Sequence, residues 1–262
     1  MCLLLIAHKV HPDFELVIAA NRDETYDRPT EPARFWSDAP NLLAGRDLMA
    51  GGTWLGVTKE GRIAGLTNYR EPGRTRGDAP SRGHLVENYL KRDDPPPAFL
   101  DYLKAKGKRY NGFAMLFGVP GTLFYTTNRN SHPRELEPGV HGLSNSLLDT
   151  PWPKVEKGRR RLREILESGQ DQDIPTALFT LLHDREIPPD GALPVTGVGP
   201  EWERKLAPLF VQTPEYGTRC STLVLARKDG TIWFEERTWR PGDTAGPVRT
   251  YDFKVERTSG SR

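Results

Sequence analysis

Short apolar runs separated by turn-forming residues recur along the chain and predict paired β-strands. Residues 2–7 are continuously apolar, and the pattern repeats over residues 14–20, after the turn-prone His11-Pro12-Asp13. This arrangement predicts an opening β-hairpin whose strands are buried on both faces. The same reasoning predicts further strands at residues 53–57, 63–67, 113–119, 122–127, 140–144, 221–226 and 231–236. Two of these strands form a hairpin wherever a short turn containing glycine separates them.

Apolar residues at helical spacing lie between these groups of strands. Over residues 81–92 they fall at Leu85, Val86, Tyr89 and Leu90, which predicts an amphipathic helix. Similar patterns predict helices at residues 98–105, 155–166 and 176–183. Hairpin-linked strands with helices grouped between them favour an α+β layered sandwich of antiparallel sheets. With no internal repeat or linker, we expect residues 1–262 to form a single domain.

Composition narrows the class of protein without identifying a ligand. The 262 residues are 36% hydrophobic and carry 37 basic and 35 acidic side chains, a formal charge of +2. A folded globular protein is therefore expected, with a small-molecule partner and no nucleic acid, because no strong field attracts one. The opening apolar run, residues 3–7, is too short for a signal peptide or a membrane span, so we expect a cytoplasmic protein.

Cys2 is the most informative single position. Methionine aminopeptidases remove an initiator methionine that precedes a small residue, so Cys2 is expected to become the N-terminus. Its α-amino group, with an ordinary pKa of about 7.7 to 8.0, would then lie beside a thiol of about 8.5, as in N-terminal nucleophiles. The alternative is that Cys2 is a small buried hydrophobic residue. The second cysteine, Cys220, is expected to pack in the core, and neither a disulfide nor a metal site is predicted.

The opening hairpin places a polar cluster beside Cys2. If the turn centres near residues 11 and 12, opposed positions sum to about 23 or 24, so Cys2 faces Asn21 and Arg22. Asp23 and Glu24 follow directly. An arginine there can hold a thiolate and an acid can position the α-amino group. The alternative is that the four polar residues mark a strand leaving the core for solvent.

Three further residues are candidates for the same site. Asn68 and Asn145 each end an apolar stretch, so each could supply an amide to a developing oxyanion, although turn formation explains such residues equally well. Arg219 precedes the predicted strand 221–226 and could add positive charge there, or face water. The five basic residues within 157–163 suit phosphate binding, but such a run is more often a solvated helix face.

Eight short motifs, in order along the chain, resemble the NRDE family, which is the transport and Golgi organisation protein 2 family. The resemblance covers the chain from Met1 to about Phe253. The motifs are Met1-Cys2, Ala20-Asn21-Arg22-Asp23-Glu24, Gly51-Gly52-Thr53-Trp54-Leu55-Gly56-Val57, Leu66-Thr67-Asn68-Tyr69, Tyr110-Asn111-Gly112-Phe113, Gly142-Leu143-Ser144-Asn145, Thr150-Pro151-Trp152 and Tyr216-Gly217-Thr218-Arg219.

That family is similar to the N-terminal nucleophile (Ntn) hydrolases, notably the choloylglycine hydrolase and penicillin acylase group, which implies a four-layer αββα fold. In that group an arginine and an aspartate three residues apart follow the second strand. Here Arg22 and Asp23 are adjacent, whereas Asn21 and Glu24 have the wider spacing.

The resemblance implies two classes of function. The first is an amidohydrolase or thioesterase that transfers an acyl group through Cys2 and requires no cofactor. The second follows from the connection of similar proteins with haem mobilisation and with lipid or acyl-coenzyme A handling. On that alternative the protein is a non-enzymatic carrier of haem or acyl-CoA, with arginines meeting carboxylate or phosphate groups.

Overall fold

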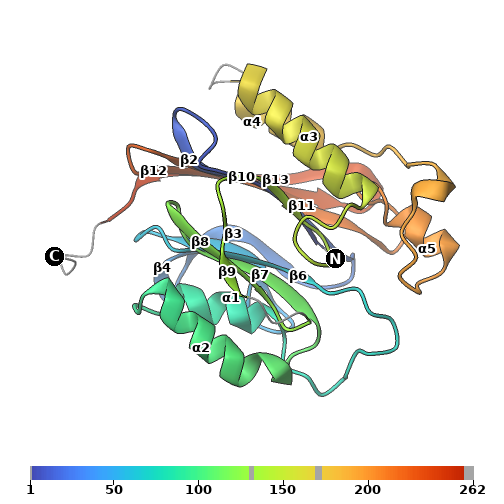
Figure 1. Ribbon diagram of the computed structural model, residues 1–262, viewed down its shortest axis with the longest axis horizontal. Helices are drawn as coiled ribbons and strands as arrows, with labels where there is room; N and C mark the ends of the chain where they lie inside the picture. Colours follow the sequence, from blue (N-terminus) through green and yellow to red (C-terminus); the bar gives the residue numbers. More distant parts are fainter. Residues whose placement is uncertain (1, 130–132, 169–172, 257–262) are drawn as a thin grey trace.

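The computed structural model describes residues 2–129, 133–168 and 173–256. Its strands form two antiparallel sheets, and Figure 1 shows them stacked face to face. The first sheet contains, in spatial order, β10 (Gly139–Leu143), β1 (Cys2–His8), β2 (Phe14–Thr25), β11 (Tyr216–Arg227), β12 (Thr231–Arg240) and β13 (Thr244–Lys254). The second contains β3 (Thr30–Trp36), β4 (Ala39–Asp47), β5 (Leu55–Thr58), β6 (Ile63–Asn68), β7 (Phe113–Val119), β8 (Thr122–Thr127) and β9 (Arg134–Glu135).

Helices cover the outer face of each sheet. On the first sheet, α3 (Pro153–Ser168) packs on β1 and β10, and α4 (Ile174–Leu182) packs on β2 and β11. On the second, α1 (Gly83–Leu90) packs on β5 and β6, and α2 (Pro96–Lys106) packs on β7. The remaining helical pieces are α5 (Pro200–Lys205) and the 3₁₀ turns Gly107–Arg109, Asp190–Ala192 and Pro241–Asp243. The layer order is therefore αββα, as predicted.

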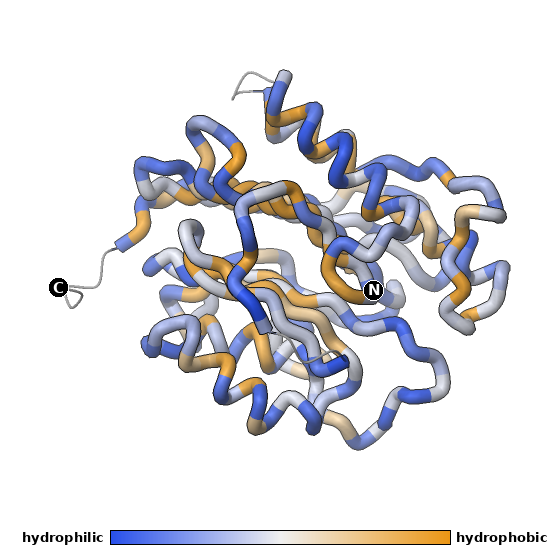
Figure 2. The backbone as a smooth tube through the Cα atoms, viewed as in Figure 1, coloured by the Kyte–Doolittle hydropathy of each residue, from blue (hydrophilic) through white to orange (hydrophobic). Residues whose placement is uncertain are grey.

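Three apolar clusters hold the four layers together, and Figure 2 shows the apolar residues concentrated along the stacked strands. The two faces of β1 illustrate the arrangement. Leu4 and Ile6 pack between the sheets, whereas Leu3 and Leu5 pack against the outer helices. Successive side chains of a strand point to opposite faces, so a strand buried on both sides must be apolar throughout. The continuous run at residues 2–7 is explained by this position.

The predicted strands and helices are present, but several elements were not predicted. The strands that the apolar pattern does not predict are β3, β4, β13 and the short β9. Of these, β3, β9 and β13 lie at sheet edges, where one side is unpaired and where polar residues and Pro32 are tolerated. Their sequences therefore lack the apolar runs that identify the central strands. In the described part of the chain, no helix is long and apolar enough to cross a membrane.

A close contact between two glycines fixes the loop between β4 and β5. A Cβ atom on Gly52 would lie 2.7 Å from the Gly83 carbonyl carbon, and Gly51 has a φ of +84°. Position 52 thus requires glycine because a side chain would not fit there, and position 51 favours glycine because of its positive φ. The contact holds this loop against the start of α1, and the two segments form one wall of the cleft described below.

Candidate functional site

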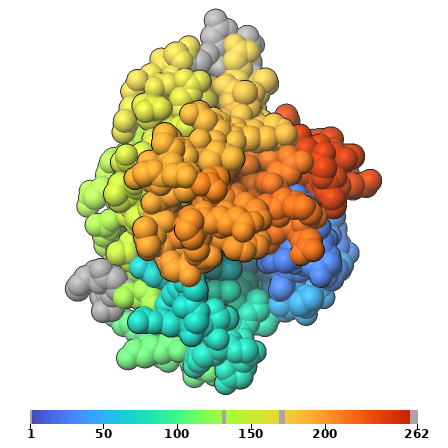
Figure 3. Space-filling view, turned by 90° about the vertical axis from the view of Figure 1, so that its right-hand side faces the viewer, coloured from blue at the N-terminus to red at the C-terminus, as the bar shows by residue number. Residues whose placement is uncertain are grey.

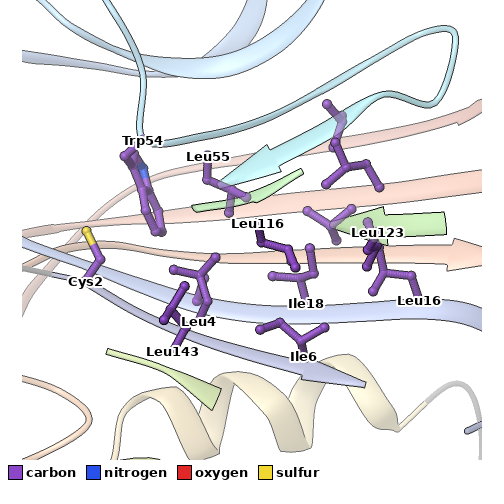
Figure 4. Close-up of a cluster of buried hydrophobic side chains, with 14 of the residues drawn as sticks. Cys2, Leu4, Ile6, Leu16, Ile18, Trp54, Leu55, Leu116, Leu123 and Leu143 are labelled. Carbon is purple, nitrogen blue, oxygen red and sulfur yellow. The ribbon is translucent and has the colours of Figure 1, made fainter. Parts of the chain in front are cut away.

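A cleft of about 480 Å³ opens at the end of the first sheet where β1 begins. Its lining comes from strands β1, β2 and β11 on one side and from the β4–β5 and β6–α1 segments on the other. Figure 4 shows Cys2 at one end of a row of buried side chains, beside Trp54. The residues predicted for the site that line this cleft are Cys2, Arg22, Asp23, Glu24, Asn68 and Arg219.

Cys2 and Arg22 are direct partners across the hairpin. The register pairs Cys2 with Arg22 in β2, and Arg22 with Cys220 in β11. Because opposed residues of antiparallel strands project to the same face, all three side chains point between the sheets, and all three line the cleft. The predicted hairpin register is confirmed. Both cysteines are free.

The Cys2 thiol lies between opposing electrostatic influences. Its residue is only 7% exposed, and burial raises the pKa of the Cys2 thiol because a thiolate loses hydration there. The charge of Arg22 lowers this pKa, whereas Asp23 and Glu24 raise it. Arg22 is held loosely, at 3.4 Å from the Thr30 hydroxyl and 3.5 Å from a carboxylate oxygen of Asp47, so its charge remains directed at the cleft.

Asp23 is buried at the back of the site. The Thr218 hydroxyl donates to its carboxylate at 2.8 Å, and the Tyr216 hydroxyl donates to its backbone oxygen at 3.0 Å. Burial raises the pKa of Asp23, and the charge of Lys154 opposes that rise. The start of β11, which supplies both hydroxyl donors, therefore fixes the position of Asp23 in the lining of the cleft.

Arg219 lies inside β11 rather than before it. The pairing with β2 shifts between Thr218 and Cys220, which leaves Arg219 as the extra residue of a β-bulge. Its guanidinium donates to the backbone oxygens of Thr25 and Arg28 at 2.7 and 3.0 Å. In a regular strand the adjacent residues Arg219 and Cys220 would project to opposite faces. The bulge allows both to line the cleft.

The two predicted oxyanion donors occupy different positions. Asn68 lines the cleft, but Asn145 does not. The Asn145 amide instead donates to the Asn68 backbone oxygen at 2.9 Å, and the neighbouring Ser144 hydroxyl donates to the Cys2 backbone oxygen at 3.2 Å. Asn145 has a φ of +48°, a conformation that asparagine tolerates better than most residues. It therefore supports Asn68 from below the cleft.

Asn21 points away from Cys2. Its amide donates to the backbone oxygens of Leu182 and Leu209 at 2.7 and 2.9 Å, and it accepts a hydrogen bond from Ser221. These partners lie on the helix-covered side of the sheet, so Asn21 fastens the end of α4 and the segment before β11 to β2. Its predicted supporting role in the cleft is replaced by this structural one. Glu24 does line the cleft and lies 3.9 Å from Arg28.

Sequence reasoning missed several charged residues of the cleft, among them Glu236 and Arg82. Glu236 is buried, accepts a hydrogen bond from the Ala33 backbone at 2.7 Å, and has its pKa raised by burial. The alternation Ile232, Phe234, Glu236 along β12 was an available signal, because the first two belong to the core between the sheets. Arg82 has no such signal, since it lies in the loop that leads into α1.

In the ranges that the structure describes, no three His, Cys, Asp or Glu side chains are arranged to hold a metal ion. The sulfur-containing residues that line the cleft are Cys2, Met49 and Cys220, and its described lining includes no histidine.

Comparisons with known proteins agree with the motif-based resemblance. The family model described as "Transport and Golgi organisation 2" matches residues 1–241. The chain is 36% identical to the Transport and Golgi organization protein 2 homolog of Bos taurus and 34% identical to that of Homo sapiens. Each match covers 98% of this chain and 100% of the relative.

Among solved structures, penicillin V acylase from Agrobacterium tumefaciens is similar with a TM-score of 0.49 and 12% identity, over 96% of this chain and 86% of that one. The family assignment rests on the sequence matches, which span nearly the whole chain. The chain belongs to the Transport and Golgi organisation 2 family.

Proposed function

We propose that this protein is an N-terminal-cysteine hydrolase that cleaves an amide or thioester bond in a small acylated substrate. The observation that carries the proposal is the position of Cys2: a free cysteine at the start of a strand, paired with Arg22, beside a buried carboxylate and open to a cleft. A cysteine used only for packing would not need charged residues on its own face of the sheet.

In the proposed reaction, the Cys2 thiol gives its proton to its own α-amino group, and the sulfur attacks the acyl carbonyl carbon. The carbonyl oxygen becomes an oxyanion that the Asn68 amide stabilises, with Asn145 holding the Asn68 backbone. The substrate C–N or C–S bond then breaks, and the leaving amine or thiol takes the proton from the α-ammonium group. Water hydrolyses the Cys2 thioester, which releases the carboxylic acid and restores the thiol.

Covalent labelling tests the proposal. An activated acyl thioester should form an adduct on Cys2, detected by intact mass and located by peptide mapping. Cys2→Ala should form none and should lose several orders of magnitude in rate, because the α-amine remains but the nucleophile is gone. Cys220→Ala is the matched control, since it removes the other buried thiol on the same face of the sheet. This variant should still form the acyl adduct on Cys2. An adduct on Cys220 alone, or equal turnover by wild type and Cys2→Ala, would contradict the proposal.

A carrier of haem or acyl-CoA is the second candidate function, and the arginines of the cleft favour it. Arg82 and Arg219 donate to backbone oxygens, and neither forms an ion pair with any described residue, so both could meet carboxylate or phosphate groups. With haem, Cys2 would be the candidate axial ligand. Equal binding of acyl-CoA by wild type and Cys2→Ala, together with equally slow hydrolysis of amides and thioesters, would select carriage over catalysis. Loss of haem binding in Cys2→Ala alone would instead identify Cys2 as an iron ligand.

A further inference from the structure

The proposed oxyanion site has one asparagine in the cleft where the sequence predicted two. Asn68 lines the cleft, but Asn145 does not, and the Asn145 amide donates to the Asn68 backbone oxygen at 2.9 Å. The oxyanion of an acyl transfer is stabilised by preorganised donors that converge on the developing charge. A second donor is therefore expected from another residue that lines the cleft near Asn68.

Arg82 is a cation of the cleft without a carboxylate partner. It lines the cleft together with Cys2 and Asn68, is half-buried, and forms no ion pair with any described residue. Arg28 and Arg46, in contrast, each lie 2.7 Å from a carboxylate oxygen. A guanidinium stays protonated in proteins and loses hydration when it is partly buried. Its uncompensated charge therefore favours a negative charge that develops in the cleft.

A shared acceptor places the Arg82 guanidinium next to Asn68. Its Nη1 donates to the Gly112 backbone oxygen at 3.0 Å, and the backbone N–H of Tyr69, the residue after Asn68, donates to the same oxygen at 2.8 Å. The acceptor is itself fixed, because a Cβ atom on Gly112 would lie 2.8 Å from the Tyr69 Cβ atom. The guanidinium therefore adjoins the backbone that carries the Asn68 amide.

Two other arginines of the described lining also lack a carboxylate partner, but they are held elsewhere. Arg219 donates to the Thr25 and Arg28 backbone oxygens, where β2 ends. Arg76 is exposed and donates to backbone oxygens at positions 108 and 109. Neither set of contacts includes the backbone around Asn68, so the geometry favours Arg82 as the second donor.

Close packing fixes the segment that carries Arg82. Arg82 directly precedes Gly83, and a Cβ atom on Gly83 would lie 3.0 Å from the Thr53 backbone oxygen. Trp54, the next residue after Thr53, lies beside Cys2 (Figure 4). In Figure 3 the orange segment that includes α5 lies against the teal segment that follows β6. The guanidinium is thus attached to backbone that is held near the nucleophile before any substrate binds, as electrostatic catalysis requires.

We propose that Arg82 is a catalytic residue that donates a hydrogen bond to the oxyanion formed when Cys2 attacks the acyl carbonyl. The inference rests on the proposed function. A guanidinium has five N–H donors, so Arg82 can bind the oxyanion and the Gly112 oxygen together. As the S–C bond forms, the carbonyl π electron pair moves onto oxygen, where Arg82 and Asn68 donate hydrogen bonds. The pair returns to the C=O bond when the leaving amine or thiol departs with the proton of the α-ammonium group, and Arg82 keeps its own protons.

Single-turnover acylation of Cys2 measures this contribution. S-phenyl thioacetate and S-(4-carboxyphenyl) thioacetate are matched probes, because one is neutral, the other is anionic, and both form an oxyanion at the same acetyl group. Arg82→Ala should slow acylation at saturating probe about 10²–10³-fold with both. Arg74→Ala is the matched control, since Arg74 is an exposed residue of the same segment and is not among the residues that line the cleft. Its rate should equal that of wild type.

Ethylguanidine added to Arg82→Ala should restore part of the lost rate, which a variant with a displaced loop would not show. A loss confined to the anionic probe would overturn the proposal, because Arg82 would then bind a substrate anion instead of the oxyanion. If Arg82→Ala does not fold, Arg82→Gln decides, since glutamine can donate to Gly112 but has no charge; a rate equal to that of wild type overturns the proposal.

The two proposals fail in different ways. Acylation of wild type together with an equal rate in Arg82→Ala refutes the role of Arg82 and leaves the hydrolase proposal intact. Complete absence of Cys2 acylation in wild type, with both probes, refutes the hydrolase proposal and the role of Arg82 with it, because no oxyanion forms.

Discussion

The two ends of β1 and β2 present the same face of one sheet to different surroundings. At one end Leu4, Ile6 and Ile18 pack against the opposite sheet and are fully buried. At the other end Cys2 and Arg22, on that same face, border a cleft. The alternation of a strand decides which face a residue occupies. Its position along the strand decides whether the facing layer covers it or leaves room for a ligand.

Asn21 and Arg22 make the same distinction between adjacent residues. Asn21 projects to the helix-covered side and is saturated by hydrogen bonds to fixed backbone and a serine. Arg22 projects to the cleft, where its contacts with Thr30 and Asp47 are 3.4 and 3.5 Å long. Asn21 is thus fully engaged in maintaining the fold, whereas Arg22 retains capacity for a ligand.

The largest expected effect concerns the apolar end. Leu4→Ala should lower the free energy of unfolding by about 2–5 kcal/mol, because it removes buried methyl groups and leaves a cavity between the sheets. Cys2→Ala, two residues away on the same face, should cost about 1 kcal/mol or less, since the sulfur borders the cleft. Urea denaturation of both variants measures the difference. Equal losses would show that the cleft end is ordinary core.

The second effect concerns catalysis rather than stability. Asn68→Ala should slow acylation of Cys2 about 10²–10³-fold, because an oxyanion donor is lost, while unfolding changes little. Asn41→Ala is a matched control, as Asn41 is exposed on β4 and donates to Glu60. Single-turnover rates with an acyl thioester probe compare the two. An unchanged rate in Asn68→Ala would remove Asn68 from the mechanism.

The third and smallest effect is a shift in pH dependence. The charge of Arg22 lowers the pKa of the Cys2 thiol, so Arg22→Gln should raise the pH midpoint of Cys2 alkylation by iodoacetamide. Below the midpoint, alkylation should slow by up to about tenfold. Arg22→Lys preserves the charge and should stay near wild type. If both variants shift equally, the guanidinium acts through shape rather than charge.

Much of the fold was predictable because the central strands are buried on both faces and therefore have continuous apolar sequences. The hairpin arithmetic brought Cys2 to the right place but left Asn21 and Arg22 as equal candidates for its partner. A shift of one residue exchanges the two faces of a strand, and only the turn geometry decides between them. The observed pairing of Cys2 with Arg22 resolves this alternative.

Other features depend on contacts between distant segments. The bulge at Arg219 arises where β11 meets β2, and no local sequence pattern specifies it. Lys154 is buried and donates to the Leu206 backbone oxygen, a contact between segments remote in sequence. Contacts of this kind across the molecule therefore limit what one sequence can reveal about a site.

The central claim is that Cys2 acts as an N-terminal nucleophile, and the N-terminus of the mature protein tests it most directly. Met1 lies outside the described residues, so this remains a prediction from the sequence. Intact-mass analysis of protein produced without an N-terminal tag should give the mass of a chain that begins at Cys2 with a free α-amino group. Complete retention of Met1 would contradict the claim, because the Cys2 nitrogen would be held in a peptide bond and could not accept the thiol proton.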